Sequence, residues 1–359
     1  MQRVHNFSAG PAVLPLEVLQ KVQSELVDFQ GSGSSIMEMS HRGPEFTEVD
    51  RQARERLTRL LGLGDNFEIL LLQGGASTQF MTVPFNFLGE GKSADYISTG
   101  SWSKKAIKEA KILGDAKVAF SSEDVNFNRI PEDNELKLNQ DAEYVHFTSN
   151  NTIFGTEFHK EPKTGNIPLV CDASSNILSK PIDIKRYGLI YAGAQKNAGP
   201  SGLTIVIIRK DFLEKARKNG IPSMVSYHTH VGTLFNTPPT FGVYFFNEVL
   251  AWVEKMGGLE GMAGLNQKKA KLLYDELDKD EFYSGTAETK SRSLMNVTFR
   301  LPSEELEKEF LSEAKSRNMV GLKGHRSVGG MRASIYNACP TESVQALVNF
   351  MQDFRSRKS

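Results

Sequence analysis

The sequence has little cysteine and no excess of charge of either sign. Cys171 and Cys339 are the only two cysteines in 359 residues, and they lie far apart. Together with seven histidines they offer no zinc-ligand spacing, so we expect no metal site and two reduced thiols. Lysine plus arginine and aspartate plus glutamate both number 43, which removes the electrostatic argument for a nucleic-acid or anionic-membrane partner.

Long hydrophobic runs are absent as well. No stretch approaches the ~18 consecutive apolar residues that a membrane-spanning helix needs. The N-terminal sequence "MQRVHNFSAGPAVLP" lacks the apolar core of a signal peptide, so we expect a cytoplasmic protein. With 39% hydrophobic and 24% charged residues, the chain has the composition of a globular protein, and it is long enough for more than one domain.

Short apolar runs alternate with helical stretches through the middle of the chain. The runs are "FEILLLQ", "SADYIST", "KVAFS", "EYVHFTS", "IPLVCDAS", "LIYAGAQ" and "LTIVIIR". Because their hydrophobicity is continuous rather than alternating, they predict strands that are buried on both faces. The sequence therefore predicts an α/β fold with a mainly parallel sheet flanked by helices. Two amphipathic helices, at 15–29 and 45–63, should precede the sheet.

The pattern changes after Gly257-Gly258, a glycine pair typical of a domain hinge. A charged helix, a strand around "SLMNVTFRL", a second helix, the segment "VGGMRASIYNA" and a last helix follow, which is an α+β pattern. We predict an N-terminal arm at 1–14, a large domain at 15–258 and a smaller C-terminal α+β domain at 259–359.

Chemically interesting residues follow several of the predicted strands. Lys196 lies among small residues in "GAQKNAGPSG", where it is either a surface charge or a desolvated amine able to form a Schiff base. Asp172 ends the run "IPLVCDASS", where it either caps a following helix or serves as a functional carboxylate. The turn Gly74 to Thr78 in "LLLQGGASTQF" exposes backbone N–H groups that can bind phosphate, although many such turns are rich in glycine.

These positions share one expected location. Open α/β sheets bind ligands at the carboxyl ends of their strands, where Gly74 to Thr78, Thr152, Asp172 and Lys196 should meet. Pyridoxal phosphate requires such a set, namely a lysine, an acid for the pyridine nitrogen, a phosphate cradle and an aromatic side chain against the ring. Trp102 in "STGSWSKKA", one of two tryptophans, could supply the aromatic group unless it is a core residue.

Motifs along nearly the whole chain carry a resemblance to a known family. They run from "NFSAGPAVLP" through "SHRGPEF", "GGAS", "TGSWS", "GAQKN" and "NTPPTF" to "GHRSVGGMRASIYNA". The chain thereby resembles the phosphoserine aminotransferases, which are class V, fold-type I pyridoxal-phosphate enzymes. The resemblance implies the fold-type I transferase architecture, a large domain that binds the cofactor, and one pyridoxal phosphate per subunit, held as a Schiff base on Lys196. Asp172 would pair with the pyridinium nitrogen, so Lys196 and Asp172 are the expected catalytic residues.

The resemblance also implies the remaining site residues. Those assigned to the cofactor besides Lys196 and Asp172 are Ala76, Ser77, Trp102, Thr152, Gln195 and, from the neighbouring subunit of a homodimer, Asn236 and Thr237. Those assigned to the substrate are Ser8, His41, Arg42, His325, Arg326 and Arg332. A phosphorylated keto acid carries a carboxylate and a phosphate, and arginine suits both, although each arginine alone could be a surface charge. Arg332 would bind the α-carboxylate, and the two His-Arg pairs would bind the phosphate or the side-chain carboxylate of glutamate. Some family members have arginine where this chain has Ser77.

The expected reaction moves the amino group of glutamate to 3-phosphohydroxypyruvate, giving O-phosphoserine and 2-oxoglutarate in serine biosynthesis, with Lys196 carrying the proton. One alternative is another class V enzyme, such as an alanine–glyoxylate transaminase or a desulfurase-type lyase. A desulfurase needs a mobile cysteine, and neither Cys171 in its strand nor Cys339 before Pro340 fits that role. Another alternative is a non-catalytic module that binds pyridoxal phosphate, which would be expected to have lost Lys196, Asp172 or the arginines.

Overall fold

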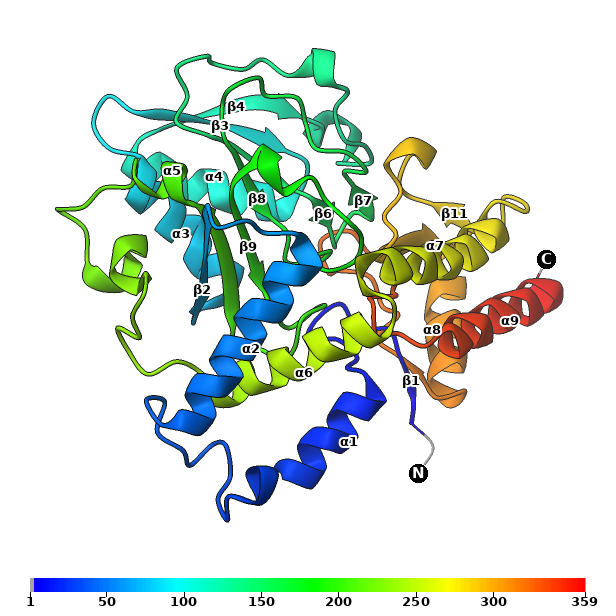
Figure 1. Cartoon of the computed structure of the whole chain (residues 1–359). Helices are drawn as coiled ribbons and strands as arrows, with labels where there is room; N and C mark the ends of the chain where they lie inside the picture. Colours follow the sequence, from blue (N-terminus) through cyan, green and yellow to red (C-terminus); the bar gives the residue numbers. More distant parts are fainter. Residues whose placement is uncertain (1–2, 359) are drawn as a thin grey trace.

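A seven-stranded sheet forms the centre of the computed structural model, which describes residues 3–358 (Figure 1). Its strands are ordered β2-β10-β9-β8-β5-β3-β4. They are β2 (Phe67–Leu72), β3 (Ser93–Ser98), β4 (Asp115–Ser121), β5 (Val145–Thr148), β8 (Leu169–Asp172), β9 (Tyr187–Gly193) and β10 (Thr204–Arg209). Each coincides with one of the predicted apolar runs, so the α/β prediction is confirmed.

The sheet is mainly parallel, with one exception. β10 runs antiparallel to both of its neighbours, β2 and β9, whereas the other pairings are parallel. The prediction of burial on both faces is wrong for β4, in which Val118 is 47% exposed. The reason is that β4 lies at the edge of the sheet and has a single neighbouring strand.

Helices cover both faces of the sheet and enclose two apolar layers. α2 (Pro44–Leu61) and α6 (Thr240–Lys255) pack on one face, and α1 (Leu16–Glu25) lies against α6 (Figure 1). α3 (Gly75–Phe87), α4 (Ser101–Leu113) and the short α5 (Lys210–Leu213) pack on the other. The helix predicted at 15–29 ends at Glu25. A 3-10 turn follows it, and the 3-10 turns of the chain are η1 (Phe29–Gly31), η2 (Glu123–Val125), η3 (Asp133–Glu135), η4 (Ile184–Arg186), η5 (Ser223–Val225), η6 (Tyr227–His230) and η7 (Thr289–Ser291).

A third apolar core belongs to the C-terminal part of the chain. It lies between a three-stranded sheet and the helices α8 (Glu304–Ser316) and α9 (Thr341–Lys358). The strands of this sheet are β11 (Ser284–Gly285), β12 (Asn296–Arg300) and β14 (Met331–Ser334). Two short pairings complete the topology, β1 (His5–Asn6) with β13 (Met319–Val320) and β6 (Asn150–Asn151) with β7 (Thr156–Glu157).

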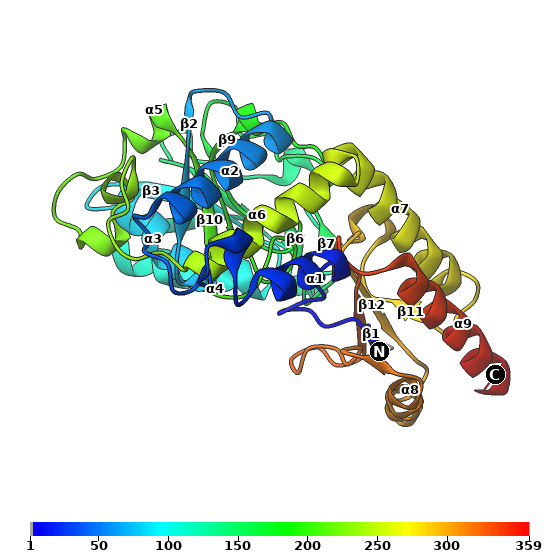
Figure 2. The same ribbon diagram turned by 60° about the horizontal axis from the view of Figure 1, so that its bottom comes forward.

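The helix α7 (Gly258–Leu277) connects the two parts of the molecule. Leu259 and Met262 in its first turns pack in the core beneath α2 and α6, whereas Leu273 and Leu277 pack in the C-terminal core. Figure 2 shows α7 leading away from α6 to a position beside α9. One rigid helix thus ties the position of the C-terminal sheet to that of the large sheet. Within residues 3–358, no helix has both the length and the apolar character that crossing a membrane requires.

Candidate active site at the carboxyl end of the large sheet

A cavity of about 160 Å³ lies where β5 and β8 end. Strand ends and the turns after them supply its wall, because these meet at one edge of a parallel sheet. The lining residues are Gly74, Gly75, Ala76, Ser77, Trp102, Thr148, Asn150, Asp172, Ser174, Ser175, Gln195 and Lys196. The structure therefore brings together Ala76, Ser77, Trp102, Asp172, Gln195 and Lys196, which the sequence had assigned to one site.

Lys196 projects its amine into this cavity from the turn after β9. Its Nζ donates a hydrogen bond to Thr152 Oγ1 at 2.7 Å and lies 5.6 Å from the centre of the Trp102 ring. Burial lowers the pKa of Lys196 to about 8; the carboxylate of Asp172 opposes that shift and the guanidinium of Arg332 adds to it. An appreciable fraction of the amine is therefore uncharged near neutral pH, as a nucleophile requires.

Asp172 is the last residue of β8 and is 4% exposed. Its Oδ1 accepts a hydrogen bond from the backbone N–H of Ser174 at 3.0 Å. Residues 174–178 form turns and not a helix, so the interpretation of Asp172 as a helix cap is wrong. Burial raises the pKa of Asp172, while hydrogen bonds from Ser174 and the charge of Lys196 lower it. A cationic ring nitrogen placed before this carboxylate would stabilise its charged form.

The amino end of α3 forms the anion-binding part of the wall. Gly74 adopts a φ of 96°, and a Cβ there would lie 2.1 Å from Thr78 Oγ1, so only glycine fits this turn. Gly75 N–H donates to Thr204 Oγ1 at 2.6 Å. The N–H groups of Ala76 and Ser77 belong to the first helical turn, where no acceptor exists within the helix, and the helix dipole favours a negative ligand there. A phosphate group fits this end of the cavity.

Three buried polar atoms around the cavity find no hydrogen-bond partner among residues 3–358. They are Trp102 Nε1, Thr148 Oγ1 and Arg332 Nε. Buried polar groups without partners are rare in folded proteins, so two in the wall of one cavity and a third on the neighbouring Arg332 indicate a polar ligand. The sequence did not single out Thr148, which ends β5 beside Asp172. A cavity with a phosphate cradle, a reactive amine, a buried carboxylate and an indole ring fits pyridoxal phosphate.

The C-terminal sheet places one arginine at this cavity. Arg332 in β14 donates from Nη1 to the carbonyl of Thr152 at 3.4 Å, and burial lowers its pKa. Thr152 is thus bonded both to Arg332 and to Lys196. The N-terminal segment covers the lysine, since Ala12 N–H donates to the carbonyl of Gln195 at 2.9 Å.

Ser8 lies in the same N-terminal segment and is partly buried. Its N–H donates to Asn6 Oδ1 at 2.9 Å. Next to it, the carbonyl of Ala9 accepts a hydrogen bond from Tyr336 Oη at 2.7 Å. The segment is therefore tied to the C-terminal part of the chain on one side and to Gln195 on the other, which keeps Ser8 near the boundary between the two sheets.

Positive charge gathers around His325, in the loop between β13 and β14. Its Nδ1 lies 2.7 Å from Ser327 Oγ. Burial first, and then the charges of Arg332, Arg326 and Lys105, lower the pKa of His325. The sequence had not assigned Lys105 to the site, although its place three residues after Trp102 puts it one helical turn away. Its Nζ lies 4.4 Å from the centre of the Trp102 ring, so it belongs to the group.

Nine of the predicted site residues do not line the cavity, namely Ser8, His41, Arg42, Thr152, Asn236, Thr237, His325, Arg326 and Arg332. Thr152 and Arg332 are nevertheless connected to it by the hydrogen bonds to Lys196 and to Thr152 given above. Arg42 is exposed and donates from its N–H to Ser40 Oγ at 3.2 Å. The carbonyl of Thr237 accepts a hydrogen bond from Gln73 Nε2 at 2.8 Å. His41, Arg42, Asn236 and Thr237 therefore do not form the wall of the cavity in their own chain.

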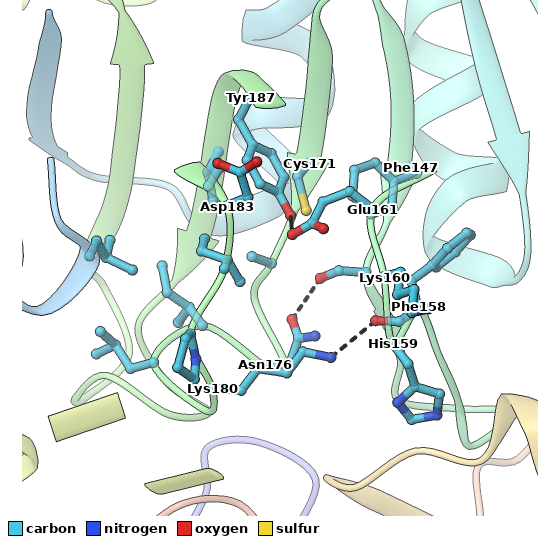
Figure 3. A pocket seen from close by; sticks show the side chains of 18 residues that line it. Phe147, Phe158, His159, Lys160, Glu161, Cys171, Asn176, Lys180, Asp183 and Tyr187 are labelled. Carbon is cyan, nitrogen blue, oxygen red and sulfur yellow. Dashed lines mark hydrogen bonds between the residues drawn. The ribbon is translucent and has the colours of Figure 1, made fainter. Parts of the chain in front are cut away.

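A second cavity, of about 390 Å³, lies on the opposite face of the sheet (Figure 3). Phe147, Phe158, Cys171 and Tyr187 line it. Because successive side chains of a strand point to opposite faces, Cys171 points into this cavity and Asp172 into the first. Burial raises the pKa of the Cys171 thiol and raises that of Cys339 to about 11, so both are poor nucleophiles. This counts against the desulfurase alternative.

Comparisons with known proteins agree on one family. Residues 4–347 match the family model described as Aminotransferase class-V. The phosphoserine aminotransferase of Lysinibacillus sphaericus (strain C3-41) is 56% identical over 359 residues, covering 99% of each chain. The solved structure of the phosphoserine aminotransferase from Bacillus circulans subsp. alkalophilus is 54% identical and superimposes with a TM-score of 0.98 over 100% of both chains. That of the PLP-bound enzyme from Trichomonas vaginalis is 42% identical, with a TM-score of 0.93 over 98% of this chain and 100% of the other.

Proposed function

Because this chain belongs to the class V aminotransferases and, within them, to the phosphoserine aminotransferases, we propose that the cavity beyond β5 and β8 is its active site. The enzyme is a pyridoxal-phosphate-dependent transaminase that moves the amino group of glutamate to 3-phosphohydroxypyruvate, giving O-phosphoserine and 2-oxoglutarate. The convergence of Lys196, Asp172 and the amino end of α3 on one cavity supports this placement. When bound, the cofactor supplies an aldehyde that takes up the amino group and a ring that withdraws electrons from the reacting carbon.

Lys196 is the residue that attaches the cofactor and later moves the proton. Its amine has a pKa of about 8 and is held by Thr152, so it is both partly uncharged and oriented. In its free form, the same amine would act as the base that removes the proton from the substrate's α-carbon. Thr152 then orients the free amine in place.

Four further groups hold the cofactor. Asp172 keeps the pyridine nitrogen protonated, and the N–H of Ser174 holds its carboxylate in place. Trp102 stacks on the ring, with Nε1 free to donate a hydrogen bond. The N–H groups of Ala76 and Ser77 bind the phosphate. Gln195 binds the ring oxygen.

Different arginines bind the two charged ends of the substrate. Arg332 binds the α-carboxylate, since it is the arginine bonded to Thr152 beside Lys196. His325 and Arg326 bind the distal phosphate. Lys105 adds a cation on this side and offsets the missing arginine at Ser77, because its charge already acts on His325. Ser8 in the N-terminal segment contacts the substrate from above Lys196.

The loops that carry His41, Arg42, Asn236 and Thr237 complete the site of a neighbouring subunit in a homodimer. Large apolar side chains support this, because Val27, Met37, Met224 and Phe235 are 82%, 53%, 52% and 45% exposed on or near the same loops. A contiguous exposed apolar patch marks a protein–protein interface, so these are the side chains that we expect a neighbouring subunit to cover. Sedimentation of the protein should give a dimer. In mixtures of Lys196→Ala and Asn236→Ala chains, hybrid dimers should recover one intact site, and no recovery would contradict the shared site.

Reduction of the enzyme with borohydride followed by peptide mass spectrometry tests the placement of the cofactor. We expect the cofactor to be fixed on Lys196. Lys269 is the informative contrast, since it is a second buried lysine whose pKa is lowered to about 8. Labelling of Lys269 in place of Lys196 would contradict the proposed site. A coupled assay with glutamate as donor compares 3-phosphohydroxypyruvate, glyoxylate and pyruvate as acceptors. A preference for 3-phosphohydroxypyruvate supports the proposed function, whereas a preference for glyoxylate would favour an alanine–glyoxylate transaminase.

A further inference from the structure

Lys269 is a buried ammonium that the proposed reaction does not use. It lies in α7 with 0% exposure, and its Nζ lies 3.0, 2.6, 3.2 and 3.3 Å from the carbonyl oxygens of Ile335, Tyr336, Asn337 and Cys339. Burial lowers its pKa to about 8, and only the thiol of Cys339 opposes that shift. A buried ammonium is costly unless acceptors take its three protons, and here four carbonyls from one loop do so. Lys269 therefore pins the loop 335–339.

Three buried asparagines connect this loop to the large domain. Asn197, Asn266 and Asn337, here called the asparagine triad, come from the turn after β9, from α7 and from the pinned loop. Their amides donate to three consecutive carbonyls of the turn 177–179: Asn197 to Ile177 at 3.1 Å, Asn337 to Leu178 at 2.8 Å and Asn266 to Ser179 at 3.1 Å.

The triad is also bonded within itself. Asn266 Nδ2 donates to Asn337 Oδ1 at 2.8 Å, and Asn337 N–H donates to Asn197 Oδ1 at 3.0 Å. These contacts occupy both the oxygen and the nitrogen of the Asn197 and Asn337 side chains. A displacement of the loop 335–339 is therefore transmitted to Asn197, the residue next to Lys196.

The turn 177–179 needs such support. Leu178 adopts a φ of 61°, a left-handed conformation that is costly for a side chain of this size and persists only where the surroundings hold it. The turn follows Asp172 and Ser174, and Ser174 Oγ accepts a hydrogen bond from Gly193 N–H at 3.1 Å, which joins it to β9. The triad thus holds the turn 177–179, which follows Asp172, and includes Asn197, which follows Lys196.

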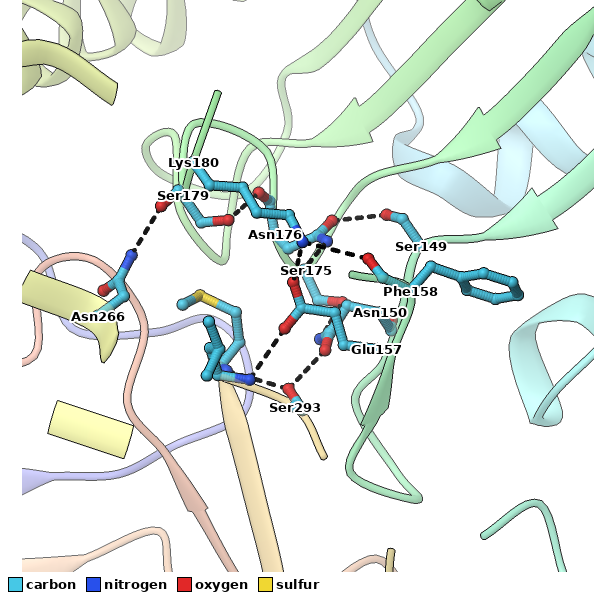
Figure 4. A network of polar contacts seen from close by, with 12 residues as sticks. Ser149, Asn150, Glu157, Phe158, Ser175, Asn176, Ser179, Lys180, Asn266 and Ser293 are labelled. Carbon is cyan, nitrogen blue, oxygen red and sulfur yellow. Dashed lines mark hydrogen bonds and ion pairs between the residues drawn. The ribbon is translucent and has the colours of Figure 1, made fainter. Parts of the chain in front are cut away.

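A second polar network holds the same segment from the other side (Figure 4). The buried carboxylate of Glu157 pairs with Lys180 at 3.0 Å and accepts from the N–H of Leu294, just before β12, at 2.9 Å. Asn150 donates to Ser175 Oγ at 2.8 Å. Figure 4 shows Asn266 reaching Ser179 on one flank of this network. The segment 173–180 is therefore clamped between the large sheet and the C-terminal sheet.

We propose that Lys269 is a positioning residue for transamination, which acts through Asn337 and the asparagine triad on the backbone that carries Lys196 and Asp172. Lys269 also fixes the position of Arg332, the residue assigned to the substrate's α-carboxylate, because the loop 335–339 follows directly on β14, which carries Arg332. Lys269 thereby fixes the position of Lys196, on the large sheet, relative to that of Arg332, on the C-terminal sheet. The proposal rests on the roles given above to Lys196, Asp172 and Arg332.

The decisive measurement is the pKa of the Lys196 amine in the full-length protein freed of cofactor, obtained by competitive labelling with acetic anhydride and mass spectrometry. Lys269→Met should raise it from about 8 by roughly one unit, because a loosened turn admits water around the amine and weakens the desolvation that lowers the pKa. Asp172 and Arg332, the charged groups that act on Lys196, are not substituted in this variant. In the cofactor-loaded enzyme kcat/KM should fall about 10- to 100-fold, the cost of a misplaced catalytic group.

Asn337→Ala is the second variant, which keeps the ammonium and its carbonyls but removes the amide that binds Leu178. It should shift the pKa of Lys196 in the same direction, and the double variant should shift it less than the sum of the two, since both act in one chain of contacts. Lys271→Met is the control, because Lys271 lies on the same helix but is exposed and pairs with Asp275. It should leave the pKa and kcat/KM unchanged.

A lowered melting temperature of Lys269→Met with an unchanged pKa of Lys196 and unchanged kcat/KM would overturn the proposal and leave a purely structural lysine. Should Lys269→Met not fold, an unchanged pKa in Asn337→Ala would overturn it as well. Failure of this proposal can be distinguished from failure of the proposed function. The pKa of Lys196 is measured without cofactor and tests the role of Lys269. The proposed function fails if borohydride fixes the cofactor on another lysine.

Discussion

The cofactor half of the site and the substrate-phosphate half are built in different ways. Lys196, Asp172, Trp102 and the amino end of α3 stand on strand ends and helix starts, and one chain brings them to one cavity. The residues expected at the phosphate lie on loops, and among them it is His325 whose pKa is lowered by burial and by the charges of Arg332, Arg326 and Lys105. By our proposal, rigid elements place the groups that hold the cofactor, whereas loops and a second subunit supply substrate specificity.

Replacing Lys196 should have the largest effect, and that effect should be confined to the cofactor half of the site. Lys196→Ala should reduce transamination by more than about 1000-fold, because both the covalent attachment and the proton transfer are lost. The visible absorption that arises from the covalent link should disappear, while circular dichroism stays that of the parent protein. Retention of both the absorption and turnover would assign the chemistry to another residue.

Asp172→Asn should reduce kcat on the order of 100-fold, because a neutral amide does not hold the ring nitrogen protonated. Bound cofactor should be retained and measurable by absorbance. In the variant freed of cofactor, the pKa of Lys196 should fall below 8, since the carboxylate raises it in the parent. Turnover like that of the parent protein would show that a different group protonates the ring.

Substitutions of Arg326 and Arg332 should affect different substrates, because the two arginines are assigned to different ends of the substrate. Arg326→Leu should cost phosphoserine ~10- to 100-fold in kcat/KM, because a charge-assisted contact is worth about 1.5–3 kcal/mol. Alanine, which has no phosphate, should be used as before. Arg332→Leu should instead weaken glutamate and phosphoserine alike. Equal losses for alanine and phosphoserine in Arg326→Leu would remove the phosphate assignment.

The pH dependence of cofactor uptake should report the cofactor half by itself. The amine attacks in its uncharged form, so the rate of reconstitution should rise about tenfold per pH unit below the pKa of Lys196 and level off above about 8. The sign follows from the lowered pKa, since an ordinary lysine would reach its plateau only above about 10.4. Stopped-flow absorbance measures the profile, and a plateau near pH 10 would contradict the buried-amine assignment.

Lys105→Met should have the smallest effect, in the phosphate half. We expect a loss of about 3- to 10-fold in kcat/KM for phosphoserine, typical of an exposed charge near a phosphate, and none for alanine. The pKa of His325 should rise, because Lys105 is one of the charges that lower it, and NMR titration measures this. Lys104→Met is the matched control, since Lys104 pairs with Glu123 instead. An equal effect in the control would deny Lys105 a specific role.

Much of the cofactor half followed from local pattern. Continuous apolar runs predicted all seven strands of the large sheet, and the residues directly after them marked its functional edge. The helix cap assigned to Asp172 as one alternative was wrong because the chain turns after β8, which the two following serines did not reveal. Lys105 was missed because its importance depends on what lies above the Trp102 ring, a contact with no signature in the sequence.

The sequence by itself determined the strands, the turn glycines and the chemical types available at the strand ends, because hydrophobic pattern and backbone conformation depend on near neighbours. Only the tertiary structure decided that β10 runs antiparallel, that Arg332 meets Thr152 from the other sheet, and that burial lowers the pKa of Lys196 to about 8. It alone placed Lys269 against four carbonyls. These properties arise from desolvation and from hydrogen bonds between residues far apart in the chain, and neither is present until the chain has folded.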